Sequence, residues 1–189
     1  MPITSFKSGT KSRSMLVGNT YYVPPSYESI ATATVGSGGA SYIEFTSIPS
    51  TFQHLHIRYT SLNSTTTSSL MQVNGDTGSN YSYHYSGRAG AGSVVAGGAG
   101  SQSNIFLGNT QQSTIPLSHI IDILDYKNTN KYKTVRLLSG GYQGAYAPWV
   151  GLLSGLWQNT NAITSLKLYP SSGTLSQYSK ATLYGIKGV

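Results

Sequence analysis

Two histidines lie at alternate positions of one short segment, His54-Leu55-His56. If this segment is a strand, both imidazoles point to the same side, and that spacing can bind a metal ion. The next residue on that side is Arg58, whose fixed positive charge opposes a bound cation, and no carboxylate or third histidine is nearby in the sequence. We therefore expect no metal here and interpret these residues as the solvated or interface face of a strand.

Acid–base catalysis needs carboxylates, and the chain has five acidic residues among 189. Asp122 and Asp125 are three apart on an expected strand, so they would point to opposite faces instead of sharing a cleft. Asp76 lies in the polar turn 74–80, whose oxygens can hold calcium, although a turn that hydrogen-bonds its own backbone is the simpler interpretation. The chain has no cysteine, which excludes thiolate ligands and nucleophiles. We predict that the protein is not an enzyme and that it uses no cofactor.

Basic residues outnumber acidic ones by 12 to 5, which gives a formal net charge of +7. Such a chain can meet nucleic acid, an anionic cell surface or an acidic protein partner. The segment 127–136 interleaves lysine and arginine with tyrosine, a pattern that can bind single-stranded nucleic acid. No nucleic-acid module is recognisable, however, and four charges on one turn are typical of a solvated hairpin tip. We therefore expect no nucleic-acid partner.

Strands and turns are the elements that must position these residues. Charged residues make up 9% of the chain, whereas soluble domains average about 25%, and 22 glycines and 15 tyrosines favour pleated strands joined by tight turns. About nine to eleven short strands are expected, which predicts an all-β fold, an antiparallel β-sandwich that is jelly-roll-like. The expected strands cover residues 27–35, 42–46, 53–62, 69–73, 81–85, 115–126, 134–138, 149–157, 163–169 and 178–186.

Three segments carry more specific expectations. Residues 115–126 are apolar at both odd and even positions, which predicts an interior strand buried on both faces. Residues 86–104 are rich in glycine, alanine and serine, which predicts a long loop. Near 151–157 the leucines also fit helical spacing, so a short helix is an alternative to a strand there.

The first 26 residues differ from the rest, so we divide the chain into an extended basic N-terminal arm, 1–26, and a β-sandwich domain, 27–189. The arm has three basic residues and no acidic one, and paired prolines close it. We expect it to become ordered on a partner and to attach the protein there, the alternative being a frayed terminus with no role. The residues expected to make this attachment are Lys7, Lys11, Arg13, Tyr21, Tyr22, Pro24 and Pro25.

Aromatic side chains form two groups that suit an interface or a sugar-binding platform, because tyrosine and tryptophan combine a large rigid area with a polar tip. Tyr81, Tyr83 and Tyr85 share one face of an expected strand. Tyr142, Tyr146 and Trp149 lie close together further along the chain. The alternative is that about half of these residues belong to the sandwich core and the sheet edges.

Six segments carry a resemblance to known proteins: YESIATATVGSGGA (27–40), IPSTFQHLHIR (48–58), VNGDTGSNYSYH (73–84), IIDILDYKNTNKYKTVR (120–136), SGLWQNTNAITSLKL (154–168) and ATLYGIKG (181–188). In this order they resemble segments of a family of small virion proteins of tailed bacteriophages. The resemblance spans about residues 27–188, and the segments look like strand and turn signatures. It implies a structural or tail-associated component of a phage particle, and it transfers no catalytic residue.

We therefore expect a capsid decoration (cement) protein that binds and stabilises the head shell. Its partners would be other virion proteins, the major capsid protein or a tail or baseplate protein, and it would form a homo-oligomer, with a trimer favoured. We expect it at the virion surface, after synthesis and assembly in the cytoplasm of the bacterial host, with no membrane association. The alternative is a tail fibre or adhesin that binds a host surface glycan.

Overall fold

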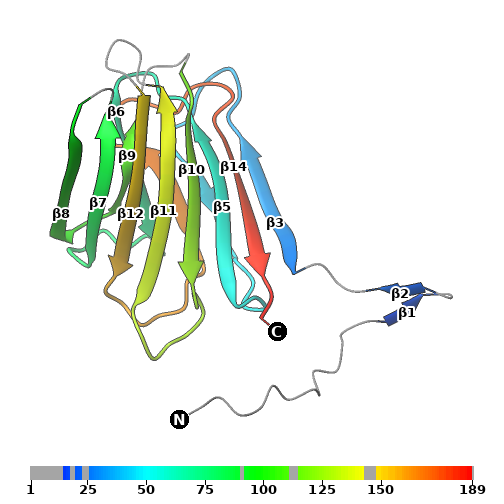
Figure 1. The fold of residues 1–189 in the computed structure, drawn as a ribbon. Coiled ribbons are helices and arrows are strands. Elements are labelled where there is room, and N and C mark those ends of the chain that lie inside the picture. Colours follow the sequence, from blue (N-terminus) through cyan, green and yellow to red (C-terminus); the bar gives the residue numbers. More distant parts are fainter. Residues whose placement is uncertain are drawn as a thin grey trace.

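The computed structural model describes residues 15–17, 20–22, 26–89, 92–110, 115–142 and 148–188. In these residues the chain forms β-strands and no helix. Twelve strands make an eight-stranded and a four-stranded antiparallel sheet, and these two sheets pack face to face as a sandwich (Figure 1). The predicted all-β antiparallel sandwich is thus confirmed. A further pair of strands, β1 and β2, forms a small sheet of its own.

The strand order of each sheet is not the order along the chain. The eight-stranded sheet runs, edge to edge, β3 (Tyr27–Thr34), β14 (Lys180–Ile186), β5 (His54–Ser61), β10 (Leu117–Leu124), β11 (Lys133–Tyr142), β12 (Pro148–Trp157), β7 (Tyr81–Ala89) and β8 (Val94–Gln102). The four-stranded sheet runs β4 (Ile43–Phe45), β13 (Leu166–Pro170), β6 (Thr67–Val73) and β9 (Ile105–Thr110). The small separate sheet pairs β1 (Met15–Val17) with β2 (Thr20–Tyr22).

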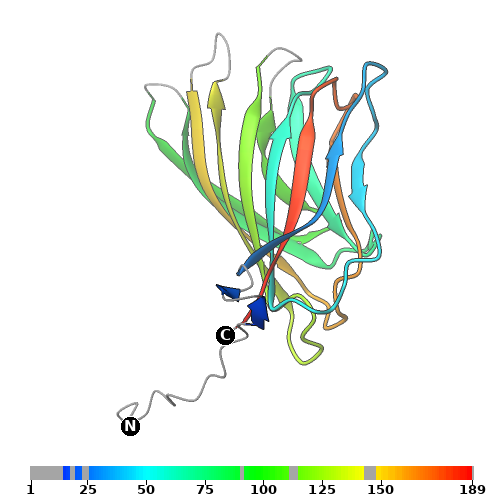
Figure 2. The same cartoon turned by 90° about the vertical axis from the view of Figure 1, so that its right-hand side faces the viewer.

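The large sheet has two parts that differ in their connections. We call β3, β14, β5 and β10 the core half, because the strands that pair within this half are far apart along the chain. We call β11, β12, β7 and β8 the hairpin half, because β11–β12 and β7–β8 are consecutive antiparallel neighbours. Figure 2 shows the sandwich from the β3 edge of the core half.

The alternation predicted for 53–62 is confirmed in β5. Leu55, Ile57 and Tyr59 point into the sandwich and are buried, while Arg58 points outward and is exposed. Apolar side chains from both sheets meet between them in one continuous core. Burying this apolar surface is the main favourable contribution to folding.

The prediction of a loop over 86–104 is wrong, because β7 continues to Ala89 and β8 follows it as the edge strand. Rings of β7 lie directly against glycines of β8. A Cβ atom on Gly97 would lie 2.7 Å from the hydroxyl oxygen of Tyr85, and one on Gly98 would lie 2.5 Å from the ring of His84. The glycines therefore leave room for rings in a paired strand, a role that composition alone hides.

Two further expectations need correction. The segment 115–126 does contain an interior strand, but β10 is buried on one face only, since Ile120 and Asp122 on its outer side are half-buried. The alternative of a helix near 151–157 is wrong, because β12 runs through all of it. Alternate β12 residues point into the sandwich and are buried, whereas Leu152 between them is exposed.

Candidate binding face of the large sheet

The expected N-terminal arm lies largely outside the described residues. Tyr21 and Tyr22 belong to β2, whose backbone pairs with Leu16 and Met15 of β1. The other residues expected to attach the arm, Lys7, Lys11, Arg13, Pro24 and Pro25, fall outside the described residues. The extended arm and its role in attachment therefore stay predictions.

Tyr81 is fully buried inside the sandwich. Its hydroxyl accepts a hydrogen bond from the Val73 amide at 3.0 Å and lies 2.9 Å from the Asp76 carbonyl oxygen, to which it donates. Burial raises the pKa of Tyr81 to about 12, so the hydroxyl keeps its proton. This side chain ties the β6–β7 turn to the core and presents nothing to a partner.

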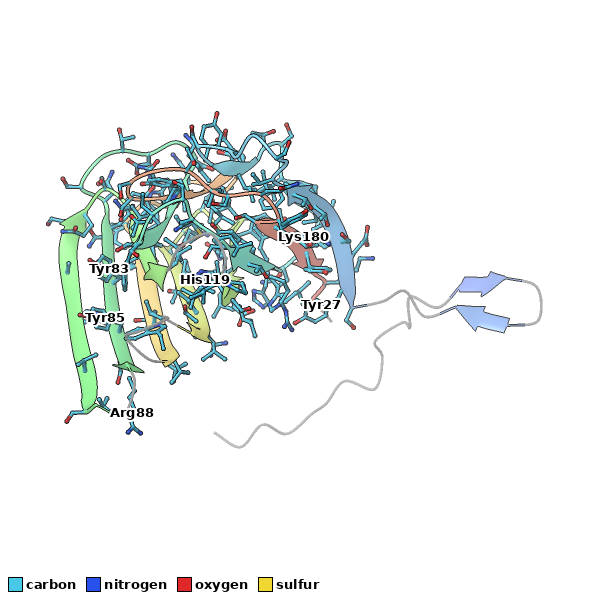
Figure 3. The ribbon with its side chains drawn as sticks, turned by 90° about the horizontal axis from the view of Figure 1, so that it is seen from above. Tyr27, Tyr83, Tyr85, Arg88, His119 and Lys180 are labelled. Carbon is cyan, nitrogen blue, oxygen red and sulfur yellow. The ribbon has the colours of Figure 1, made fainter. Side chains whose placement is uncertain are left out.

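Tyr83, Tyr85 and Trp149 also lie on the inner face of the hairpin half. Tyr83 and Tyr85 are half-buried, and their ring centroids are 5.5 and 5.7 Å from that of Phe106 on β9 (Figure 3). Trp149 is buried, and its indole covers Gly87 and Gly151. Tyr142 ends β11, while its side chain and Tyr146 fall outside the description.

The polar turn at Asp76 bonds to itself, as predicted. The Asp76 carboxylate accepts hydrogen bonds from the Gly78 amide at 2.9 Å, from Asn80 at 3.0 Å and from the Trp157 indole at 2.8 Å. Burial opposes ionisation, but the hydrogen bonds from Trp157, Asn80 and Gly78 outweigh it, so the pKa of Asp76 is lowered. Because its oxygens accept these hydrogen bonds, the carboxylate stabilises the turn.

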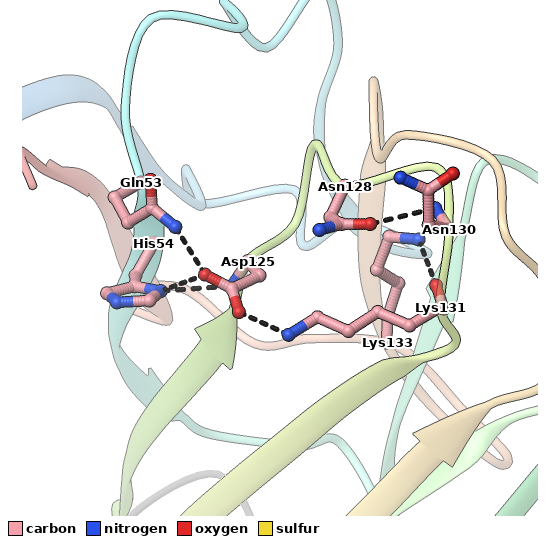
Figure 4. Close-up of polar contacts among 7 residues, drawn as sticks. All are labelled: Gln53, His54, Asp125, Asn128, Asn130, Lys131 and Lys133. Atoms are coloured by element: carbon pink, nitrogen blue, oxygen red, sulfur yellow. Dashed lines mark hydrogen bonds and ion pairs between the residues drawn. The ribbon is translucent and has the colours of Figure 1, made fainter.

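The basic turn between β10 and β11 likewise bonds internally (Figure 4). The Asp125 carboxylate accepts from Lys131 and Gln53, which lower its pKa, and the Asp125 amide donates to Nδ1 of His54 at 2.9 Å. Nζ of Lys133 donates to the Lys131 and Thr160 carbonyls, each at 2.9 Å. Lysine side chains that already bond to groups in and beside their own turn are poorly placed to follow a nucleic-acid backbone.

His56, the other half of the predicted histidine pair, has both ring nitrogens occupied. Nδ1 lies 2.7 Å from Oδ1 of Asp122, and Nε2 accepts a 2.8 Å hydrogen bond from Nε of Arg58. His56 and His54 thus each bond to protein groups of their own surroundings. Within the described ranges, no three His, Cys, Asp or Glu side chains come close enough together to hold a metal ion.

Exposed aliphatic side chains gather on the outer face of the hairpin half. Leu138 is 43% exposed, Val150 54% and Leu152 68%, and half-buried Ile120 adjoins them. Cross-strand pairing puts Ile120 beside Leu138 and Leu138 beside Leu152, so the group, which we call the aliphatic patch, is continuous. It borders an open concavity of about 570 Å³. A contiguous exposed apolar patch marks a binding surface.

Charged side chains surround the aliphatic patch. Arg136 lines the same concavity as Leu138 and Leu152, together with Asp122 and His84. Arg58 sits directly across from Ile120 on the neighbouring strand β5. Asp122 is already bonded to His56, so Arg136, its cross-strand neighbour, is left without a hydrogen-bond or ion-pair partner among the described side chains. The concavity thus combines an apolar floor with an open guanidinium.

Sequence reasoning missed the aliphatic patch although a signal for it exists. Residues 149–157 carry large apolar side chains at odd and even positions alike. In a two-layer sandwich each strand has one covered face, so apolar residues at both parities leave one set in solvent unless a partner covers it.

The chain matches no protein-family model and no curated protein. The part of the chain that the structure describes has no helix long and apolar enough to cross a membrane.

Proposed function

We propose that this protein is a bacteriophage virion structural protein, a capsid decoration protein that binds and stabilises the head shell. The aliphatic patch carries the proposal. Its exposed leucine and valine side chains, bordered by Arg136, suit a protein partner because binding would bury apolar surface and pair the open guanidinium. An acidic shell surface would also attract a chain of net charge +7.

We further propose that the sandwich is a jelly roll, and the strand order supports this. Without the β7–β8 and β11–β12 hairpins, eight strands remain, in the orders β3-β14-β5-β10 and β4-β13-β6-β9. Numbered one to eight along the chain, these are 1-8-3-6 and 2-7-4-5, the order of two nested Greek keys. Jelly rolls occur in viral capsid proteins and in lectins, which agrees with the resemblance to phage virion proteins.

The hairpin half would then be an addition that widens one sheet of the jelly roll. Its outer face carries most of the aliphatic patch, so we assign attachment to this half. We expect a homotrimer on the particle, since decoration of a symmetric shell calls for a closed ring of copies.

The experiment is a binding assay with phage heads that lack this protein. Leu152→Glu should weaken attachment at least about 100-fold, because it puts a charge in the centre of a buried interface. Thr34→Glu is the matched control, since Thr34 is exposed on the outer face of the core half. Immunogold label should lie over the head. Full attachment of Leu152→Glu, or label confined to the tail, would refute the proposal.

The N-terminal arm supplies a second test. Deleting residues 1–26 should abolish attachment to the particle while the sandwich keeps its melting temperature. Replacing Lys7, Lys11 and Arg13 by glutamine should weaken attachment most at low salt, where charges are least screened. Truncated protein that occupies particles fully would show that the arm has no part in attachment.

One observation favours the alternative, a tail adhesin that binds a host surface glycan. It is a tyrosine-lined pocket on the outer face of the core half, away from the hairpin half.

A further inference from the structure

The pocket lies where β3, β14 and β5 run side by side. Tyr27, Tyr184, His56 and Arg58 line an open concavity of about 490 Å³. Tyr27 is 51% exposed, whereas the histidine at the bottom is 6% exposed. Figure 3 shows Tyr27 at the opposite end of the large sheet from Tyr83 and Tyr85, so the pocket lies away from these two tyrosines.

The floor of the pocket is a chain of hydrogen bonds whose donors and acceptors can be assigned in one way only. A guanidinium only donates, so Nε2 of His56 must accept from Nε of Arg58 at 2.8 Å. The ring proton is therefore on Nδ1 and is donated to Asp122 at 2.7 Å. This relay fixes the Nε edge of Arg58, while its terminal nitrogens have no hydrogen-bond or ion-pair partner among the described residues.

The walls are two tyrosine rings, each of which lies close to the buried imidazole. The Tyr27 ring stands edge-on to His56, with a centroid distance of 5.7 Å and an angle of 82°. The Tyr184 ring is tilted by 54° at 6.2 Å, on the strand directly beside β5. Each tyrosine thus presents an aromatic surface and a polar tip at the rim of the pocket.

We propose that this pocket binds a carboxylate-bearing sugar residue, a uronic or sialic acid, of a glycan. The terminal nitrogens of Arg58 would hold the carboxylate in a bidentate pair, the geometry that a guanidinium provides. The apolar face of the sugar ring would lie against Tyr27 or Tyr184, and its hydroxyls would meet the tyrosine tips. His56 and Asp122 are positioning residues that hold the guanidinium ready.

The test is a titration of the full chain, by chemical shift changes and calorimetry, with sialyllactose and with an oligosaccharide of glucuronic acid. Each acidic sugar is paired with a neutral counterpart, lactose or the carboxyl-reduced oligosaccharide. We expect at least one acidic sugar to bind and its neutral counterpart to bind at least about tenfold more weakly, since the charge-assisted pair is then lost.

Three variants separate the contributions. Arg58→Gln should weaken binding of the acidic sugar at least about tenfold and leave binding of the neutral sugar unchanged. Tyr184→Ala should weaken binding of both sugars equally, because stacking of the sugar ring on tyrosine does not depend on the carboxylate. Arg136→Gln is the control, since Arg136 lies on the same outer face but lines the other concavity. It should leave sugar affinity unchanged.

Three results would overturn the inference. They are the absence of binding for both acidic sugars, an equal loss in Arg58→Gln and Arg136→Gln, and tighter binding of a glutamate-rich peptide than of either sugar. The inference does not depend on attachment to the head, because Leu152→Glu tests the hairpin half and Arg58→Gln tests the core half. Either proposal can fail alone.

Discussion

The two halves of the large sheet differ in the side chains that they present on the outer face. In the core half, polar side chains of neighbouring strands bond to one another, as Thr32 does to Thr182 at 3.0 Å and His56 to Asp122 at 2.7 Å. In the hairpin half, Leu138 and Leu152 face outward and are exposed. The first surface is satisfied in water, whereas the second gains by being covered.

The inner faces of the two halves also differ, in how deeply their side chains are buried. The core half contributes Leu55 and Ile121, both fully buried in the continuous core. The hairpin half is covered mainly by β9, and Tyr83 and Tyr85 stay half-buried beside Phe106. The hairpin half also supplies buried core residues, among them Tyr81, Leu153 and Trp157, so the two halves differ in how completely they are covered at Tyr83 and Tyr85 and not in whether they join the core.

The largest expected effect comes from a pair of glycines that are each covered by a ring. In the core half, a Cβ atom on Gly185 would lie 2.2 Å from Cγ of Phe52, which is buried. Gly185→Ala should lower the free energy of unfolding by about 3 kcal/mol in urea titrations, because a packed ring cannot move aside.

The matched change in the hairpin half is Gly97→Ala, where the ring of Tyr85 is half-buried and can turn away. It should cost less than about 1 kcal/mol of unfolding free energy in the same titration. Equal losses for Gly185→Ala and Gly97→Ala would remove the distinction between the two halves.

The next effect is a loss of stability in acid that originates in the core half. His119 stacks on Tyr59 at 5.0 Å, and burial lowers its pKa to about 3 from an ordinary value of 6.5. Between these two pH values the unfolded chain binds one more proton than the folded chain, so stability falls as the pH drops below 6.5. The slope should reach about 1.4 kcal/mol per pH unit.

Urea unfolding at pH 7, 6 and 5 measures this slope. His119→Gln should flatten it in this range, whereas His84→Gln, a change on the exposed outer face of the hairpin half, should leave it as it is. An unaltered slope in His119→Gln would show that the acid sensitivity arises elsewhere.

The smallest effect on stability is expected at Leu152. Leu152→Ala should change the free energy of unfolding by less than about 0.5 kcal/mol, because the side chain is exposed. Its neighbour Leu153 points inward and is buried, so Leu153→Ala should cost about 2–5 kcal/mol. A large loss in Leu152→Ala would mean that the aliphatic patch stabilises the monomer instead of awaiting a partner.

Local patterns in the sequence were enough for much of the fold. The alternation of β5 predicted which of its residues face the core, and the Asn74-Gly75 turn was predicted from its residue types. Both turn residues have positive φ, 52° and 66°, as a tight hairpin turn requires. The β8 strand was missed, because glycine carries no pattern and its pairing depends on rings supplied by β7.

The sites could not be predicted in the same way. Tyr27 and Tyr184 are separated by most of the chain, and β14 brings them together by pairing with both β3 and β5. Tyr81 and Trp149 look like surface contacts in a polar, tyrosine-rich chain, but their strands turn them inward. The partner sheet determines which face of a strand is exposed to solvent. The order of strands in a sheet cannot be predicted from the local periodicity of the sequence.

The most direct test of the attachment proposal is cryo-electron microscopy of phage particles that carry the protein. We predict many copies on the head, with Leu138, Val150 and Leu152 buried against the shell. Copies confined to the tail, or head-bound copies whose aliphatic patch faces the solvent, would contradict it.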